Sequence, residues 1–427
     1  MGTFIIEGKQ ILSGEYHPSG NKNAAFPILS AALLTDEPVI IHNIPDIGDI
    51  RTMLAIVADL GTEITYHSKH SATLQTGKLK KIAPNPELFC QIRGALVLMG
   101  SILAREGRVI LTIPGGDSIG RRRIDTHLAV LQALGTDIKF NNQFVLTANK
   151  LEGIDYLLDE ASVTGTENAI LAAVTAEGTT ILNNAACEPH VQELCLMLNQ
   201  MGAKIRGIGS NILRIEGVSS LHGTEFTIGS DYIEVGSIIG LAAVTHSEIL
   251  IKNAVPKHMR MILLVLERLG VKVLVQGEDI LVPANQDLVI TSDIGGMIPK
   301  IEDGTWPSFP ADMMSIALTI ATQIEGTILV HEKMYESRMY FVDKLIGMGA
   351  RIVLCDPHRA IVQGPSPLHA EPQGISSPDI RAGMALLIAA LCADGTSKIH
   401  NIRQIDRGYE HIDEKLRLLG AKIKRIK

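Results

Sequence analysis

The apolar residues of this chain gather into six runs, and the same short elements follow each run. Within each run the apolar positions cover most of the circumference of a helix, which predicts a buried helix rather than a surface one. The runs consist mainly of small and aliphatic residues and lie at 24–34, 94–104, 169–176, 236–245, 313–322 and 382–393. A turn and a strand are expected after four of them, at 106–110, 177–181, 325–328 and 394–396.

A glycine tag ends each segment: leucine or methionine, glycine, a small residue, a charged residue and a β-branched residue. An amphipathic helix is expected before the tag, as at 128–134 and 412–419. The glycine predicts a helix end in the left-handed region, with a strand after it. Six tags at nearly even spacing indicate an internal repeat, with the glycines at Gly61, Gly135, Gly202, Gly270, Gly349 and Gly420.

The repeat predicts the fold class. Units of about 70 residues that alternate helices and strands give an α/β protein, and 427 residues are too many for one ordinary core. We therefore expect two domains of three units each. A solenoid is the competing arrangement, although its repeats are usually about 20–50 residues long.

Composition excludes several functions. The net charge of -7 argues against nucleic acid and anionic membranes as partners, so an anionic ligand needs a local cationic pocket. The five cysteines are irregularly spaced and contain no CxxC, which favours reduced thiols in the cytoplasm and no metal site. The start of the chain lacks the pattern of a signal peptide, and the longest apolar stretch, near 384–393, is too short to span a bilayer.

Polar residues precede every apolar run. Capping explains Thr166 and Asp231. It does not explain Lys22, Arg93 and Arg381, because a cation is disfavoured near the positive end of a helix dipole. An anion bound between these cations is the better explanation, and helix N-termini favour such anions.

The segment 114–123 combines three glycines with three consecutive arginines. It could be a solvated basic turn, or a mobile lid that brings cations onto a phosphate. It is not a P-loop, because Gly-Lys-Ser/Thr is absent.

Four motifs together resemble those of the UDP-N-acetylglucosamine 1-carboxyvinyltransferases, members of the EPSP synthase family. The motifs lie at 19–25, 114–120, 309–313 and 405–410. The resemblance covers essentially the whole chain. It implies two inside-out α/β domains of three repeats each, one formed by 22–230 and the other by 231–427 with 1–21.

The resemblance also implies an activity. Family members transfer the enolpyruvyl group of phosphoenolpyruvate to the 3-hydroxyl of UDP-N-acetylglucosamine and release phosphate, through a tetrahedral ketal. This is the first committed step of peptidoglycan synthesis, and it needs no metal or organic cofactor. The expected partners are these two small molecules alone.

The implied site residues fall into three sets. Those that match catalytic positions of the family are Asp117, Asp312, Lys22 and Arg407. Those that match phosphoenolpyruvate ligands are Lys22, Asn23, Arg122, Arg338, Arg381 and Arg407. Those that match UDP-N-acetylglucosamine ligands are Asn23, Arg93, Arg122, Arg123, Ile124, Asp125, Thr126, Ser162, Val163, Asp312 and Met334.

Two aspartates have implied chemical roles. Asp312 matches the family's base, which takes the proton of the sugar hydroxyl. A closed cleft could raise the pKa of this carboxyl, and a raised pKa would suit it as a proton acceptor. Asp312 could instead cap the helix at Met313, or do both. Asp117 stands where most of the family has a cysteine and is implied as the proton donor, so we expect resistance to the epoxide fosfomycin.

Three positions depart from the usual family pattern. Arg123 replaces a common proline, Glu160 a common lysine near the diphosphate, and Tyr232 a common arginine at the domain crossover. Glu160 would oppose a diphosphate unless Arg123 or Arg121 compensates for it. The alternatives are therefore a paralogue that acts on another UDP-sugar, or a non-catalytic regulator that binds one.

Overall fold

The computed structural model describes residues 2–116, 120 and 122–426, and its contacts divide the chain into two compact units. The N-terminal unit contains Gly20–Asp117 and Arg122–Gly229. The C-terminal unit is built mainly from Met1–Ser19 and Ser230–Lys427. The expected domain limits, 22–230 and 231–427 with 1–21, stay a proposal.

The six apolar runs form buried helices, as predicted. All thirteen residues of the helix that opens the C-terminal unit, α8, are buried. In the N-terminal unit α4 packs on α6, and in the C-terminal unit α10 packs on α12 and α8. The six helices are α1 (Lys22–Ala31), α4 (Leu98–Glu106), α6 (Val163–Ala173), α8 (Tyr232–Val244), α10 (Met314–Ala321) and α12 (Ile380–Cys392). Short 3-10 turns flank several of them: η1 (Ala32–Leu34), η2 (Arg93–Val97) and η3 (Ala311–Met313).

The glycine tags also behave as predicted. All six tag glycines have positive φ, between 81° and 117°, where a side chain would be strained. The helices before them are α2 (Gly48–Leu60), α5 (Asp125–Ala133), α7 (Pro189–Gln200), α9 (Pro256–Arg268), α11 (Val342–Gly347) and α13 (Ile412–Leu418). The strands after them are β4 (Glu63–Ser68), β7 (Asp137–Phe140), β11 (Lys204–Arg206), β15 (Leu274–Gln276), β19 (Arg351–Asp356) and β23 (Ile423–Ile426).

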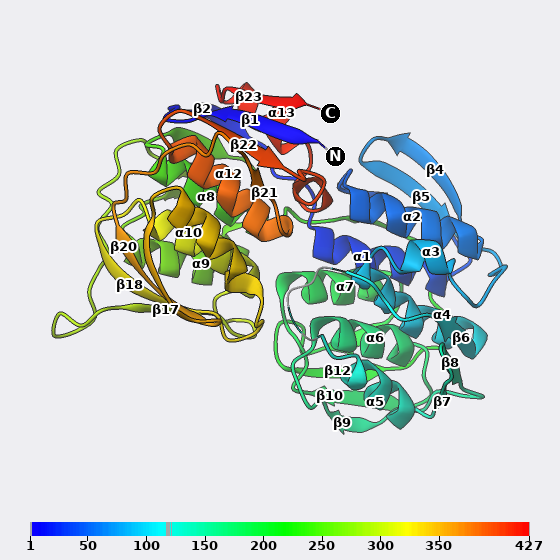
Figure 1. The fold of residues 1–427 in the computed structure, drawn as a ribbon. Coiled ribbons are helices and arrows are strands. Elements are labelled where there is room, and N and C mark those ends of the chain that lie inside the picture. The colour runs from blue at the N-terminus through cyan, green and yellow to red at the C-terminus, as the bar shows by residue number, and fades with distance from the viewer. Residues whose placement is uncertain (1, 117–119, 121, 427) are drawn as a thin grey trace. The chain divides into compact units, whose positions relative to one another are not determined.

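The six repeats correspond to six small sheets, of which the N-terminal unit and the C-terminal unit contain three each. In the N-terminal unit the strand orders are β13-β3-β5-β4, β6-β8-β7 and β11-β12-β10-β9. Figure 1 shows these sheets outside the helices of their unit, which is the inside-out arrangement that the resemblance implies. Their remaining strands are β3 (Val39–His42), β5 (Ser71–Gln75), β6 (Arg108–Leu111), β8 (Phe144–Thr147), β9 (Asp155–Leu157), β10 (Thr179–Asn183), β12 (Ile212–Glu216) and β13 (Thr224–Thr227).

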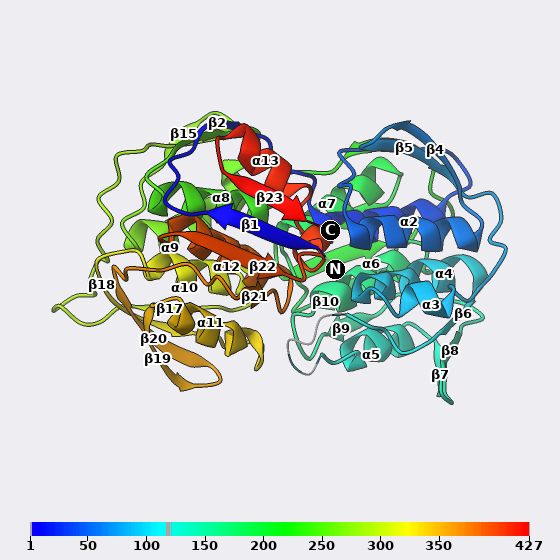
Figure 2. The ribbon, with the colours of Figure 1, turned by 45° about the horizontal axis from the view of Figure 1, so that its top comes forward.

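In the C-terminal unit the orders are β15-β16-β14-β2, β17-β18-β20-β19 and β21-β22-β1-β23. The first residues of the chain complete two of these sheets, and β1 lies between β22 and β23 (Figure 2). The strands are β1 (Thr3–Glu7), β2 (Ser13–Tyr16), β14 (Glu248–Ile251), β16 (Asp279–Val282), β17 (Lys300–Glu302), β18 (Gly326–His331), β20 (Arg359–Gly364), β21 (Ile375–Ser376) and β22 (Thr396–His400). Across the described ranges, every helix is too short or too polar to cross a bilayer.

Candidate active site

Three predicted site residues meet inside the C-terminal unit. Asp312 lies on η3, Arg338 on the 3-10 turn η4 (Arg338–Phe341), and Arg381 in the first turn of α12. The Arg338 Nη2 atom donates to Asp312 Oδ1 at 2.5 Å, and the Arg381 Nε atom donates to Asp312 Oδ2 at 3.0 Å. Both arginines are buried, so little water screens these pairs.

The two arginines decide the charge of Asp312. Burial alone raises the pKa of its carboxyl, but Arg381 and Arg338 more than offset this and hold the pKa well below its ordinary value. The expectation of a raised pKa is therefore wrong for this state. The capping interpretation is wrong as well, since the Asp312 side chain caps neither η3 nor α10.

The same arginines retain donors for another anion. Among the described residues, Arg338 Nε and Arg381 Nη1 are buried and have no hydrogen-bond partner. Tyr335 and Tyr409 flank the two guanidinium groups, with ring centroids at 5.1 and 5.3 Å. A buried donor without a partner is costly, so the pair favours an acceptor such as a carboxylate.

The helix starts carry caps, but not always at the predicted residue. Asp231 caps α8 as expected and accepts from the amides of Ile233 and Glu234. The prediction for Thr166 is wrong: Ser162 caps α6, and the Thr166 hydroxyl accepts from the amide of Ala186.

The cations at the helix starts have partners within the protein. Lys22 opens α1, and its Nζ lies 2.8 Å from Asp49 Oδ2, with both side chains nearly buried. Sequence reasoning missed Asp49, whose one signal is its position in the first turn of α2, where a negative charge is favoured. The ion pair with Asp49 thus explains a cation at the start of α1 without a bound anion, and the ion pair with Asp312 does the same for Arg381.

The Lys22–Asp49 pair gives a stability prediction. Asp49→Ala leaves a buried ammonium without its counter-charge, so the free energy of unfolding should fall by about 3 kcal/mol or more. Asp59→Ala is a matched control on the same helix, because Asp59 pairs with Lys81 and both side chains are more exposed than those of Lys22 and Asp49. The control should cost about 1 kcal/mol or less by urea denaturation. Equal losses in the two variants would contradict a special role for the buried pair.

The first two glycines of the glycine-rich segment lie close to neighbouring residues of the N-terminal unit. A Cβ on Gly115 would lie 1.7 Å from the Cys90 carbonyl oxygen, and Gly116 has a φ of 124°. Arg93, one of the predicted diphosphate ligands, donates through Nη2 to the carbonyl oxygens of Arg122 and Arg123 at 2.9 and 2.8 Å. Arg93 therefore holds the backbone at Arg122 and Arg123. Asp117 and Arg121 lie outside the described residues.

Part of the predicted nucleotide set is brought together by Asp159, which the sequence did not single out. Asp159 accepts from the Thr126 hydroxyl at 2.7 Å and from Arg123 Nη2 at 3.0 Å. The Thr126 hydrogen bond is the main reason that the pKa of Asp159 is lowered. Arg123 also pairs with Asp125 at 3.1 Å. Its ion pairs are therefore with Asp125 and Asp159, and the predicted compensation of Glu160 by Arg123 is not seen.

The other predicted nucleotide residues lie at the ends of helices. Ile124 precedes α5 and is half-buried, while Ser162 and Val163 form the start of α6. The Asn23 amide donates to the cap residue Asn21 at 2.8 Å. Met334 belongs to the C-terminal unit, where its side chain is exposed and its amide donates to Glu332.

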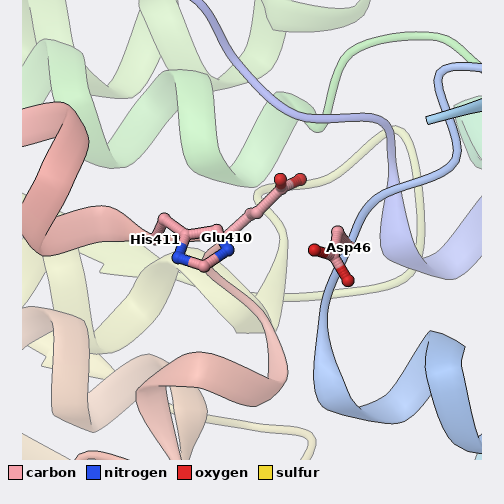
Figure 3. A group of neighbouring side chains, drawn as sticks. All are labelled: Asp46, Glu410 and His411. Carbon is pink, nitrogen blue, oxygen red and sulfur yellow. The ribbon is translucent and has the colours of Figure 1, made fainter. Parts of the chain in front are cut away.

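Arg407 lies on the turn η5 (Ile405–Arg407) of the C-terminal unit and donates to Gln404 Oε1 at 2.9 Å. Glu410 and His411 follow on the same segment, and Figure 3 shows their side chains with that of Asp46 from the N-terminal unit. Asp46 has cations of its own unit, Arg51 and Lys69, which lower its pKa to about 2. These carboxyl and imidazole groups are not assigned to a metal, and the expectation that none is needed stays a prediction.

Lys22 and Arg122 belong to the N-terminal unit and Arg407 to the C-terminal unit, so their shared role toward one phosphate stays a prediction. Tyr232 opens α8, buried beside Trp306 with ring centroids 6.0 Å apart. Where the family commonly has a cation, this chain therefore has aromatic packing.

The repeat, the inside-out units and the caged aspartate define an enolpyruvyl transferase fold. The family model of EPSP synthase (3-phosphoshikimate 1-carboxyvinyltransferase) matches residues 6–416, and the chain belongs to this family. Two solved structures share the fold: the enolpyruvyl transferase NikO from Streptomyces tendae, and EPSP synthase from Acinetobacter baumannii. The first has a TM-score of 0.88 at 24% identity, covering 99% of this chain and 98% of that one. The second has a TM-score of 0.76 at 18% identity, covering 100% of both chains.

The chain is also similar over its full length to curated relatives that share one name. The chain is 53% identical to UDP-N-acetylglucosamine 1-carboxyvinyltransferase of Treponema denticola, over 99% of both chains. It is 53% identical to the enzyme of that name from Bradyrhizobium diazoefficiens, over 99% of this chain and 98% of the relative. It is 48% identical to that from Bacteroides fragilis, over 100% of both.

Proposed function

We propose that this chain transfers the enolpyruvyl group of phosphoenolpyruvate to the 3-hydroxyl of UDP-N-acetylglucosamine and releases phosphate. Full-length relatives at about half identity that carry this activity in their name support the proposal. The observation that carries it is the position of Asp312 between the buried Arg338 and Arg381, because the remaining donors of these arginines suit a carboxylate. The product would enter peptidoglycan synthesis at its first committed step.

The geometry of the arginines suggests how Asp312 becomes a base. The carboxylate of phosphoenolpyruvate would compete with Asp312 for the guanidinium donors of Arg338 and Arg381. As those donors turn to the substrate, the pKa of Asp312 rises from its depressed value, and its freed oxygen can accept the proton of the sugar hydroxyl. Asp312 is therefore a weak base until phosphoenolpyruvate binds, and it becomes a stronger base once the substrate is in place.

The reaction then proceeds by addition and elimination. The sugar oxygen bonds to C2 of phosphoenolpyruvate while C3 takes a proton, for which Asp117 is the proposed donor. This gives a tetrahedral ketal. Loss of phosphate and of a proton from C3 leaves the enol ether. Lys22, Arg122 and Arg407 are the proposed phosphate ligands, which would stabilise the charge that develops on the leaving group.

The nucleotide would be held mainly by the N-terminal unit. The proposed uridine contacts are Arg122, Arg123, Ile124, Asp125 and Thr126. Arg93 and the start of α6 at Ser162 and Val163 are proposed for the diphosphate, where the helix N-terminus favours an anion. Asn23 and the backbone of Met334 are proposed for the sugar. We also propose a cytoplasmic location, which the five free cysteines support.

A phosphate-release assay tests the proposal directly. Phosphoenolpyruvate with UDP-N-acetylglucosamine should release phosphate, and the same assay with UDP-glucose and UDP-N-acetylgalactosamine should release much less. UDP-glucose lacks the acetamido group, and UDP-N-acetylgalactosamine inverts one hydroxyl. Faster release with either analogue would favour the paralogue that acts on another UDP-sugar. Binding of UDP-sugar without phosphate release in any of these assays would favour the non-catalytic regulator.

A further inference from the structure

Two buried carboxyl groups behind the arginine pair have no part in the proposed chemistry. Asp303 follows β17 and Glu332 follows β18, and these two strands are parallel neighbours (Figure 1). Asp303 is 1% exposed and Glu332 is fully buried. Such groups are rarely buried unless they are hydrogen-bonded, so their partners indicate what they do.

The two carboxyl groups hold three consecutive amides of one turn. Asp303 Oδ1 accepts from the amide of Lys333 at 2.5 Å. Glu332 Oε1 accepts from the amides of Met334 and Tyr335 at 3.2 and 3.1 Å. This turn leads directly into η4, whose first residue is Arg338. The turn therefore contains the backbone of Met334, and its conformation sets where Arg338 begins η4.

The two carboxyl groups also act on each other. Asp303 Oδ2 and Glu332 Oε2 are buried and have no hydrogen-bond partner among the described residues. Burial and the neighbouring Asp303 raise the pKa of Glu332 to about 9. The Glu332 carboxyl therefore keeps its proton at neutral pH and can donate a hydrogen bond to Asp303.

Few other charged or titratable groups lie near Asp303 and Glu332 among the described residues. Arg338 acts against the rise in the pKa of Glu332, though more weakly than burial and Asp303 act for it. His358 Nδ1 lies 2.9 Å from the carbonyl oxygen of Glu332. The side chains of Lys333 and His331 lie near Glu302 instead, at 3.7 and 3.9 Å.

We propose that Asp303 and Glu332 are positioning residues, two buried carboxyl groups that fix the 333–335 turn through its amides and thereby aim Arg338 at Asp312. The inference rests on the proposed function, since Arg338 matters through its part in binding phosphoenolpyruvate. It adds two residues that touch neither substrate and act through the backbone of one turn.

Conservative and truncating variants separate positioning from simple burial. Asp303→Asn keeps an acceptor for the Lys333 amide and gives Glu332 a donor, so kcat/KM for phosphoenolpyruvate should stay within about 2-fold of wild type. Asp303→Ala leaves the Lys333 amide unpaired, and kcat/KM should fall roughly 10- to 100-fold. Glu302→Ala removes a half-exposed neighbouring carboxylate and is the matched control, with an expected change within about 2-fold.

A second measurement does not depend on activity. The folded protein keeps a proton on the pair up to pH of about 9, whereas an unfolded glutamate loses it near its ordinary value. Stability should therefore fall as pH rises between these two values. Asp303→Asn lowers the pKa of Glu332, so between pH 6 and 9 its urea midpoint should fall less than that of wild type.

The outcomes are separable. Equal kcat/KM for Asp303→Ala and Asp303→Asn, or parallel pH dependence of wild type and Asp303→Asn, would overturn the inference. If the alanine variant does not fold, Glu332→Gln takes its place: it keeps the acceptor and donates to Asp303, so near wild-type turnover with a flattened pH dependence is expected. If wild type itself releases no phosphate, the proposed function fails, and the pH measurement still decides whether Glu332 keeps its proton.

Discussion

Asp312→Asn is expected to lower kcat for phosphate release by about 10²- to 10⁴-fold, the usual contribution of a general base. The amide cannot take the proton of the sugar hydroxyl, even after the arginines have turned to phosphoenolpyruvate. It also removes the carboxylate that competes with phosphoenolpyruvate for Arg338 and Arg381, so the loss should appear in kcat and not in the binding of phosphoenolpyruvate. Steady-state kinetics over both substrates and calorimetric titration with phosphoenolpyruvate measure the two effects.

Ser315→Ala is a matched control for Asp312→Asn. Ser315 is buried on α10 close to Asp312 in the chain, and its hydroxyl has no hydrogen-bond partner among the described residues. This variant should keep kcat within about 2-fold, because it perturbs the same helix without removing a proton acceptor. A kcat for Asp312→Asn within tenfold of wild type would rule out Asp312 as the base.

The fold was largely predictable because its signals are local. A glycine that must adopt positive φ at a helix end occurs six times, and each position reports the helix before it and the strand after it. The insertion of β1 between β22 and β23 is different, since those strands lie almost 400 residues further along the chain. No periodicity indicates that pairing, and only the resemblance implied that residues 1–21 belong with the second half.

The site was less predictable because its electrostatics depend on distant partners. Asp312 owes its lowered pKa to Arg338 and Arg381, which are 26 and 69 residues away. Sequence reasoning named all three residues but could not pair them, and so predicted the wrong direction of the shift. Asp49 was missed for the same reason. Thr166 was taken for a cap because the helix begins at Val163, ahead of its apolar run at 169–176, and its cap is Ser162.

Fosfomycin is expected to leave phosphate release by this enzyme almost unchanged after prolonged incubation, whereas the variant Asp117→Cys should lose its activity. The epoxide is opened by a thiolate, and a carboxylate is a much weaker nucleophile toward it. Residual phosphate release and mass spectrometry of the intact chain measure the loss and the covalent adduct. Asp117 lies outside the described residues, so this expectation depends on the sequence alone.

The exposed Cys90 supplies the control for that experiment. Its Sγ lies 3.4 Å from the carbonyl oxygen of Ile113, just before the glycine-rich segment, so it is a native thiol that could react in place of residue 117. The double variant Asp117→Cys with Cys90→Ser should still form one adduct, whereas Cys90→Ser alone should form none. Rapid labelling of Asp117 in the wild-type chain would refute the expectation, because a carboxylate would then suffice to open the epoxide.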